Sequence, residues 1–252
     1  MATIRSWREA ADDLLRDLRT ILDTRLRALV VYEAHGLLGD MPVASPGDEA
    51  GLRHEQLVHS VAIVDGLGHA DLLRLAPLAA GWAGRSLAVP LFLSPTELQR
   101  SLDAFPLEFG QILARHVVIV GDDPFRGLAV ASEDMRRACE AQVRSHLLHL
   151  REGYLQTAAE PKRVAALVAA SVVPLRALLV NIARLHGVEA RTPKILAEFV
   201  EQRLRLPMGG LRPLLSAKQA KLFEGEDVGA FLPAYLDAVE RLAALVDEWS
   251  RT

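Results

Sequence analysis

Three acidic side chains have surroundings in which a carboxylate could do chemistry. Asp40 ends the stretch VVYEAHGLLGD, Asp65 follows the apolar run LVHSVAIV, and Glu108 lies between bulky apolar residues in FPLEF. Carboxylates that converge on one point can bind Mg²⁺, which clamps the oxygens of a transferred phosphoryl group. Glu108 either faces a pocket or pairs with a base such as Arg115, because a charge on an apolar helix needs a partner. We therefore take Asp40, Asp65 and Glu108 as the candidate catalytic residues.

The turn in VVYEAHGLLGD suggests contact with a phosphate. A strand-like run ends at Tyr32, and the loop that follows contains two glycines and closes with Gly39 and Asp40. Proteins that handle nucleoside triphosphates often break a strand in this way, so that the backbone can approach the phosphate oxygens. They usually carry Gly-Ser where this chain carries Glu33 and Ala34, and a glutamate there repels a triphosphate. Gly39 and Asp40 remain the candidate ligand contacts of the turn.

Basic side chains gather in the stretch RSHLLHLREGYL. Arg144, Arg151 and Tyr154 could reach a small anionic ligand or a nucleotide in a cleft between two domains, because pockets favour domain interfaces. The other interpretation is an amphipathic helix with a polar outer face. His146 and His149 lack the i, i+4 spacing of a helical zinc site, so we expect no metal site there.

Two successive patterns of elements must position these side chains. Over the first ~130 residues helices alternate with strands, and the rest of the chain is almost purely helical. The periodicity predicts helices over 4–24, 70–83, from 94 and from 106, and strands over 29–32, 57–64, 87–93 and 117–120. Four long helices follow, from 132, over 167–185, from 193 and over 228–249. We expect an α+β domain over 1–130, with a small mixed sheet, and an all-α helical bundle over 131–252.

Local signals predict where several elements begin and end. The segment SPTE, Ser94–Glu97, offers an N-cap serine, a proline for the first helical position and the glutamate of a capping box. The Phe-Pro step at 105–106 ends that helix, and the Thr-Pro step at 192–193 begins another. Pro90 lacks an N–H group, so the third strand is expected at a sheet edge or with a bulge.

Composition disfavours membrane and nucleic-acid partners. The net charge is −3 over 252 residues, so no overall field attracts nucleic acid. The most apolar stretch, Val164–Ala183, contains Arg176, and the cost of an arginine inside a bilayer favours a buried bundle helix. Cys139 is the only cysteine, and the charged N-terminal stretch lacks the apolar core of a signal peptide. We therefore expect a cytoplasmic protein in which Cys139 is buried in the bundle.

Most of the chain resembles the polymerase-beta-like nucleotidyltransferase superfamily. The resemblance is carried by the order helix, strand, glycine turn, strand, helix, strand and bundle, and by three stretches: VVYEAHGLLGD, LFLSPTELQRSLDAFPLEFGQILARHVVIVGDDP and RSHLLHLREGYL. Within the superfamily, the chain is similar to small bacterial proteins with a nucleotidyltransferase domain and a C-terminal helical bundle. The resemblance implies a Gly-Ser turn, an Asp-x-Asp pair on the next strand, a third carboxylate, a nucleoside triphosphate and Mg²⁺.

The sequence departs from that pattern at the positions that bind metal. Alignment of LVHSVAIVD with the metal-binding strand places Val58 and Ser60, or else His59 and Val61, at the two aspartate positions. Positions i and i+2 of a strand share a face, but neither register supplies a carboxylate. The active-site motif is therefore degenerate, and the resemblance indicates common ancestry more strongly than it indicates activity.

Three functions follow as expectations. The first is a non-catalytic pseudoenzyme that serves as a ligand-binding or protein-interaction module. The second is an active nucleotidyltransferase that uses Mg²⁺ to move a nucleoside monophosphate to a small-molecule or protein hydroxyl, with Asp40, Asp65 and Glu108 as its carboxylates. The third is a structural partner that forms a homodimer through the bundle.

Overall fold

The computed structural model describes residues 6–32, 57–216 and 228–249, in two compact units that meet in sequence at Ala131 and Ser132. The first unit contains α1 (Trp7–Leu22), a 3₁₀ turn (Asp23–Arg25), β1 (Leu26–Tyr32), β2 (His59–Val64), α2 (His69–Ala79), a 3₁₀ turn (Ala83–Arg85), β3 (Leu91–Leu93), α3 (Pro95–Ala104), α4 (Pro106–Ala114) and β4 (Val117–Val120). The second contains α5 (Ser132–Gln156), α6 (Pro161–Leu185), α7 (Pro193–Gln202), α8 (Arg212–Ser216) and α9 (Val228–Trp249). The expectation of an α+β fold with a mixed sheet, followed by helices, is confirmed at this level of detail.

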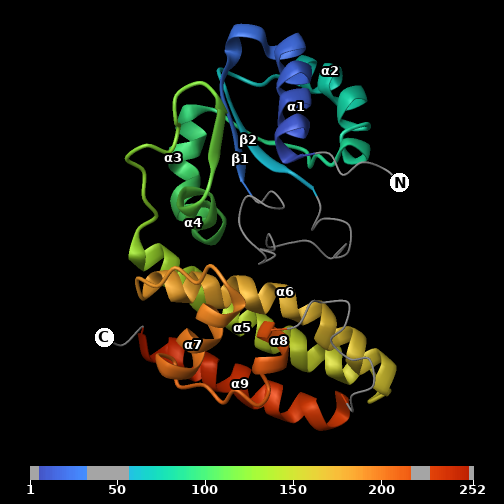
Figure 1. The fold of residues 1–252 in the computed structure, drawn as a ribbon, viewed down its shortest axis with the longest axis vertical. Helices are drawn as coiled ribbons and strands as arrows, with labels where there is room; N and C mark the ends of the chain where they lie inside the picture. The colour runs from blue at the N-terminus through green and yellow to red at the C-terminus, as the bar shows by residue number, and fades with distance from the viewer. Residues whose placement is uncertain (1–5, 33–56, 217–227, 250–252) are drawn as a thin grey trace. The chain divides into compact units, whose positions relative to one another are not determined.

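The sheet of the first unit has four strands in the order β3-β2-β1-β4 (Figure 1). β1 is antiparallel to both of its neighbours, and β2 is parallel to β3. Tyr32 pairs with His59, and Val31 pairs with Val117. The end of β1 and the starts of β2 and β4 therefore share one end of the sheet, which we call the Tyr32 end.

The two faces of the sheet are covered by different helices. α1 and α2 lie on one face and α3 and α4 on the other (Figure 1). Alternation along the strands sends Leu29 and Ala62 toward α1, whereas Val30 and Val61 point toward α4. All four side chains are fully buried. Because both faces are packed, the strands read as continuous apolar runs.

Local signals in this unit act as expected, with corrections to three element lengths. Ser94 Oγ accepts from the N–H of Glu97 at 3.2 Å, and the Glu97 carboxylate accepts from the N–H of Ser94 at 2.7 Å, which completes the capping box. The third strand spans only Leu91–Leu93, because its ladder begins after Pro90, and it lies at the sheet edge as expected. The second helix ends at Ala79 rather than at 83, and the first strand begins at Leu26 rather than at 29.

The second unit differs in one respect from the expected bundle of four long helices. α5, α6 and α9 have 25, 25 and 22 residues, but α7 has only 10. α5 packs against both α6 and α9. Thr192 Oγ1 accepts from the N–H of Ile195 at 3.3 Å and caps α7, as the sequence predicts. The backbone of Arg205 has a positive φ of 53°, a conformation that does not continue a helix.

α6 contains the stretch that could be taken for a membrane span. In the described residues it is the one helix that is long and apolar enough to cross a bilayer, but 56% of its most apolar window is buried inside the protein. Arg176 in this helix is 4% exposed, and its Nε donates to the carbonyl oxygen of Leu214 in α8 at 2.7 Å. Burial and an arginine bonded within the unit are typical of a core helix in a soluble protein.

Candidate functional site

The Tyr32 end of the sheet brings together aromatic and polar side chains from three elements. Tyr32 is buried and His59 is half-buried, and their ring centroids lie 5.9 Å apart. His116 precedes β4, whose first residue pairs with Val31, so the sheet register brings it to the same end. The Tyr32 ring is part of the core, so His59 is the ring at this end that is partly open to solvent.

α4 carries two polar side chains, and its last turn lies beside this end of the sheet, because the carbonyl oxygen of Ile112 lies 2.8 Å from Nδ1 of His116, which precedes β4. Phe109 and Ile112 bury the helix in the same core cluster as Tyr32. Glu108 and Gln111 stand one turn apart, so they lie on the same side of α4. Gln111 is only 6% exposed and Glu108 is half-buried, yet neither side chain makes a hydrogen bond or ion pair with any described residue. Glu108 therefore forms no ion pair with Arg115, which is the alternative partner that the sequence suggests.

Glu108 has an altered acidity. Burial raises the pKa of its carboxyl group above the ordinary value of 4.5, because water stabilises the charged form and the protein interior does not. A half-buried carboxyl group with a raised pKa and no partner among the described residues is a candidate for ligand binding or catalysis. Of the three acidic residues singled out in the sequence, Glu108 has these surroundings, and its catalytic role stays a prediction.

His116 is held rigidly beside this end. Its Nδ1 lies 2.8 Å from the carbonyl oxygen of Ile112, and its Nε2 lies 3.2 Å from Oδ1 of Asp123. The same oxygen of Asp123 accepts from the N–H of Phe125 at 2.9 Å, which closes the turn after β4. Since both ring nitrogens are engaged, His116 serves to order this turn rather than to bind a ligand.

Asp65 does not join Glu108. The N–H of Asp65 donates to the carbonyl oxygen of Arg25 at 2.9 Å, and its carboxylate forms an ion pair with Arg27. Because β1 and β2 are antiparallel, Asp65 lies where β1 begins, at the end of the sheet opposite Tyr32. The other two candidates of the turn, Gly39 and Asp40, lie outside the described residues. In the described ranges no three His, Cys, Asp or Glu side chains are grouped to hold a metal ion.

β2 and Val58, the residue before it, place buried side chains at three of the four positions expected for metal ligands. Val58 is 3% exposed, Ser60 is 1% exposed and Val61 is fully buried. The hydroxyl of Ser60 has no hydrogen-bond partner, so it is a small polar atom enclosed in the core rather than an exposed ligand. His59, at the Tyr32 end, is the first residue of the strand and only half-buried. This strand therefore offers no pair of carboxylates, and its side chains are committed to packing.

The basic residues of α5 are paired with acidic residues of α9. Arg144 Nη2 lies 2.7 Å from Asp247 and 3.2 Å from Glu140, and Arg151 Nη2 lies 2.7 Å from Glu240. These pairs join α5 to α9 and compensate much of the positive charge that an anionic ligand would need. Tyr154 is 38% exposed on the same helix. The role of Arg144, Arg151 and Tyr154 in anion binding stays a prediction.

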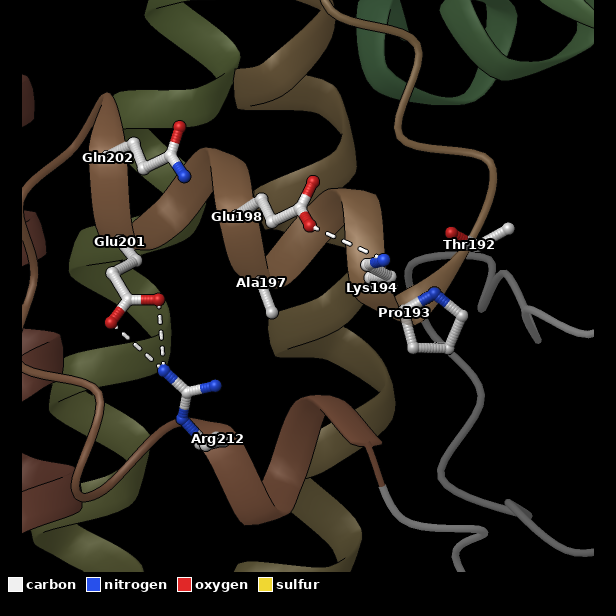
Figure 2. A pocket seen from close by; sticks show the side chains of 8 residues that line it. All are labelled: Thr192, Pro193, Lys194, Ala197, Glu198, Glu201, Gln202 and Arg212. Carbon is white, nitrogen blue, oxygen red and sulfur yellow. Dashed lines mark hydrogen bonds and ion pairs between the residues drawn. The ribbon is translucent and has the colours of Figure 1, made fainter.

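The second unit also has a shallow groove between α7 and α8 (Figure 2). Its volume is about 660 Å³, and its walls carry two ion pairs. Arg212 Nη2 lies 2.9 Å from both carboxylate oxygens of Glu201, and Lys194 lies 3.9 Å from Glu198. Because the opposite charges in the walls already face one another, the groove presents no unpaired charge to a ligand.

The interior of the second unit contains a chain of hydrogen-bonded side chains. His146 Nε2 lies 2.8 Å from the hydroxyl of Tyr235, which lies 2.9 Å from Oγ of Ser171. His146 is 8% exposed and Tyr235 is fully buried. The three residues come from α5, α9 and α6 and are up to 89 positions apart, so periodicity could indicate their burial but not their pairing. This network links the three long helices of the described unit.

Glutamine at position 108 is expected to raise the stability of the first unit near neutral pH, by less than about 1 kcal/mol for a carboxyl that is partly solvated. Because the folded-state pKa of Glu108 is raised, ionisation of this carboxyl group lowers the free energy of unfolding of the wild type. The loss begins as pH rises through the ordinary value of 4.5 and is complete above the folded-state pKa. Urea denaturation of wild type and Glu108→Gln near pH 4 and pH 7 measures it, and the gain should appear only at the higher pH.

Glu97→Gln on the preceding helix is the matched control. The pKa of Glu97 is lowered by hydrogen bonds from Ser94, so removal of its charge should destabilise the unit near neutral pH. A loss of stability in both variants would mean that Glu108 has a favourable partner in the folded chain.

The function has to be inferred from the arrangement of the described residues. Neither a protein-family model nor a curated protein matches this sequence. The candidate site of the described residues is the Tyr32 end of the sheet, where His59 is half-buried and beside which α4 carries Glu108 and Gln111.

Proposed function

We propose that the protein is a nucleotidyltransferase-like pseudoenzyme, a cytoplasmic module that binds a nucleotide without transferring it by the two-metal route. The observation that carries the proposal is the burial of β2. In the first register for metal-binding carboxylates the chain carries Val58 and Ser60, which are 3% and 1% exposed. In the second it carries the half-buried His59 and the fully buried Val61, so at least one position of each register lies in the core. Introduction of two carboxylates there would cost core packing, so this strand is built for stability and not for metal binding.

The order of elements supports the nucleotidyltransferase-like part of the proposal. The described chain runs α1, β1, β2, α2, β3 and then, after further elements, into the helical unit. This is the order on which the resemblance rests. The burial of Cys139 supports the cytoplasmic part: the thiol is fully enclosed, and burial raises its pKa to about 12, so it is neither reactive nor available for a disulfide.

The Tyr32 end supports binding of a nucleobase. The amide of Gln111 can donate and accept, and the carboxyl of Glu108 can accept or, when protonated, donate. Such groups match the edge of a base, and polar groups without a partner in the folded chain can gain one from a ligand. His59, which is half-buried, adds a ring on which a base can stack, and such stacking contributes about 1–3 kcal/mol per base in proteins that bind single strands.

A thermal-shift titration tests the proposal. ATP and the other nucleoside triphosphates should raise the unfolding midpoint of the wild type without Mg²⁺, because a ligand that binds only the folded state stabilises it by RT ln(1 + [L]/Kd). Inorganic triphosphate, which lacks a base, should give no shift. Glu108→Gln and Gln111→Leu should reduce the nucleotide shift, whereas Asp65→Asn, at the opposite end of the sheet, should leave it unchanged. The proposal fails if millimolar nucleotide gives no shift in the wild type.

An active nucleotidyltransferase is the second candidate, and the acidity of Glu108 is the observation that favours it. A raised pKa brings a carboxyl group closer to the range in which it can act as a general base toward an acceptor hydroxyl. Release of pyrophosphate from nucleoside triphosphates with Mg²⁺ or Mn²⁺ distinguishes the two functions. Metal-dependent release that Glu108→Gln abolishes would replace the pseudoenzyme by the enzyme.

A further inference from the structure

α5 has an exposed face that no described element of the second unit covers. Its inward residues are buried against α6 and α9, while a second line of residues is exposed at spacings of three and four. We call this line the outer stripe of α5; it consists of Arg137, Ala141, Arg144, Leu148, Glu152 and Leu155. Leu148 is 62% exposed and Leu155 is 79% exposed, which makes them two of the most exposed leucines of the described chain. The two leucines form only a small apolar area, so the charged side chains around them decide what this face can bind.

The outer stripe is self-complementary about Leu148. Arg144 stands four residues before Leu148 and Glu152 four residues after it, while Ala141 and Leu155 stand seven before and seven after. In an antiparallel pair of identical helices with Leu148 at the two-fold axis, Arg144 comes level with Glu152 of the second copy. Ala141 comes level with Leu155 of the second copy, so that a large side chain faces a small one.

We propose that the outer stripe of α5 binds the same stripe of a second copy of this chain, antiparallel, with Leu148 at the two-fold axis. The contact joins two leucines at the axis, two Arg–Glu pairs beside them and two Leu–Ala contacts beyond. Because of the two-fold symmetry, the Arg–Glu and Leu–Ala contacts each occur twice, whereas the Leu148 contact at the axis occurs once.

The ion pairs inside one chain leave room for this contact. Arg144 already lies near Asp247 and Glu140, but its side chain is 55% exposed and a guanidinium group has five N–H donors. Glu152 is 65% exposed, and its partner in the described chain is His149, whose Nδ1 lies 3.5 Å away. Both side chains can therefore reach a second copy without breaking the helix packing around them.

Sedimentation of the full-length protein over a concentration series tests the proposal. The wild type should form a dimer, and Leu148→Glu should raise the dimer dissociation constant by at least about tenfold, because two carboxylates would meet at the axis. Leu73→Glu is the matched control: Leu73 is also 62% exposed, but it lies on α2 in the other unit. It should leave the dissociation constant unchanged. A monomeric wild type, or an equal effect of both substitutions, overturns the proposal.

A charge exchange tests the orientation of the two copies. Arg144→Glu alone and Glu152→Arg alone each place like charges opposite one another twice, so each should weaken the homodimer by about tenfold. A mixture of the two variants should associate as tightly as the wild type, because every pair in the mixed dimer is again of opposite charge. Circular dichroism confirms that both variants are folded before mixing. Failure of the mixture to associate overturns the antiparallel arrangement.

Discussion

Replacement of Gly210 by alanine is expected to destabilise the second unit by about 1–3 kcal/mol, the cost of overpacking at a site with little freedom to relax. A Cβ atom at Gly210 would lie 2.3 Å from both the carbonyl carbon of Ala234 and the nitrogen of Tyr235. These are backbone atoms in the interior of α9, so no side-chain rotation relieves the clash. The connector before α8 and the last helix must move apart, and the packing around the buried Tyr235 is disturbed with them.

Gly209→Ala is the matched control for this prediction. No atom lies within 4 Å of a Cβ at Gly209, so the same methyl group one residue earlier should change the free energy of unfolding by less than about 0.5 kcal/mol. Hydrogen exchange of α9 amides, followed by mass spectrometry, reports on this unit separately from the first. Equal protection of α9 in both variants would show that the close approach of Gly210 to α9 does not limit packing.

Acidification is expected to destabilise the second unit by about 3 kcal/mol through His146 alone, since one pKa unit corresponds to about 1.4 kcal/mol. Burial, with a smaller contribution from the neighbouring His149, lowers the pKa of His146 from 6.5 to about 4. As the pH falls, the histidine therefore protonates in the unfolded chain while it is still neutral in the folded unit. Its effect is absent above the unfolded pKa of 6.5, grows as pH falls, and is complete below about pH 4.

His146→Gln provides the comparison that isolates this effect. Glutamine does not titrate, and its side-chain amide can still bond to the hydroxyl of Tyr235, which keeps Ser171 as its other partner. The free energy of unfolding of both proteins, measured by urea denaturation between about pH 7 and pH 4, should converge as the pH falls. Subtraction of the two curves removes the contribution of the carboxylates that both proteins share. Parallel curves would mean that His146 is solvated or already charged in the folded unit.

Much of the local structure could be predicted from short-range sequence signals. The capping box of Ser94 and Glu97 and the cap at Thr192 depend on residues three positions apart, so the chain near each cap contains all the information required. The edge position of β3 follows from Pro90, which has no N–H group to give to a ladder. The alternation of strands and helices, followed by helices alone, likewise indicated the fold class before any contact was known.

The candidate site was only partly predictable. FPLEF singled out Glu108 as a charge among apolar residues, and the structure adds that it has no partner in the described chain. Asp65 was grouped with it because both are acidic, but the antiparallel pairing of β1 and β2 carries Asp65 to the opposite end of the sheet. The burial of Gln111 could not be predicted from the sequence, because most glutamines on helices are exposed.

The sequence by itself determined most of the elements, many of their ends and the absence of carboxylates from β2, because each depends on residue types and spacings within a few turns. Tertiary structure decided which side chains meet. His146 and Tyr235 are 89 residues apart, Arg176 bonds to a carbonyl 38 residues away, and Gly210 is required by the backbone of α9. Such contacts arise only when helices pack. Buried polar groups then need hydrogen-bond partners, and closely packed backbones need small residues between them. No local pattern along the chain specifies where these partners and small residues must lie.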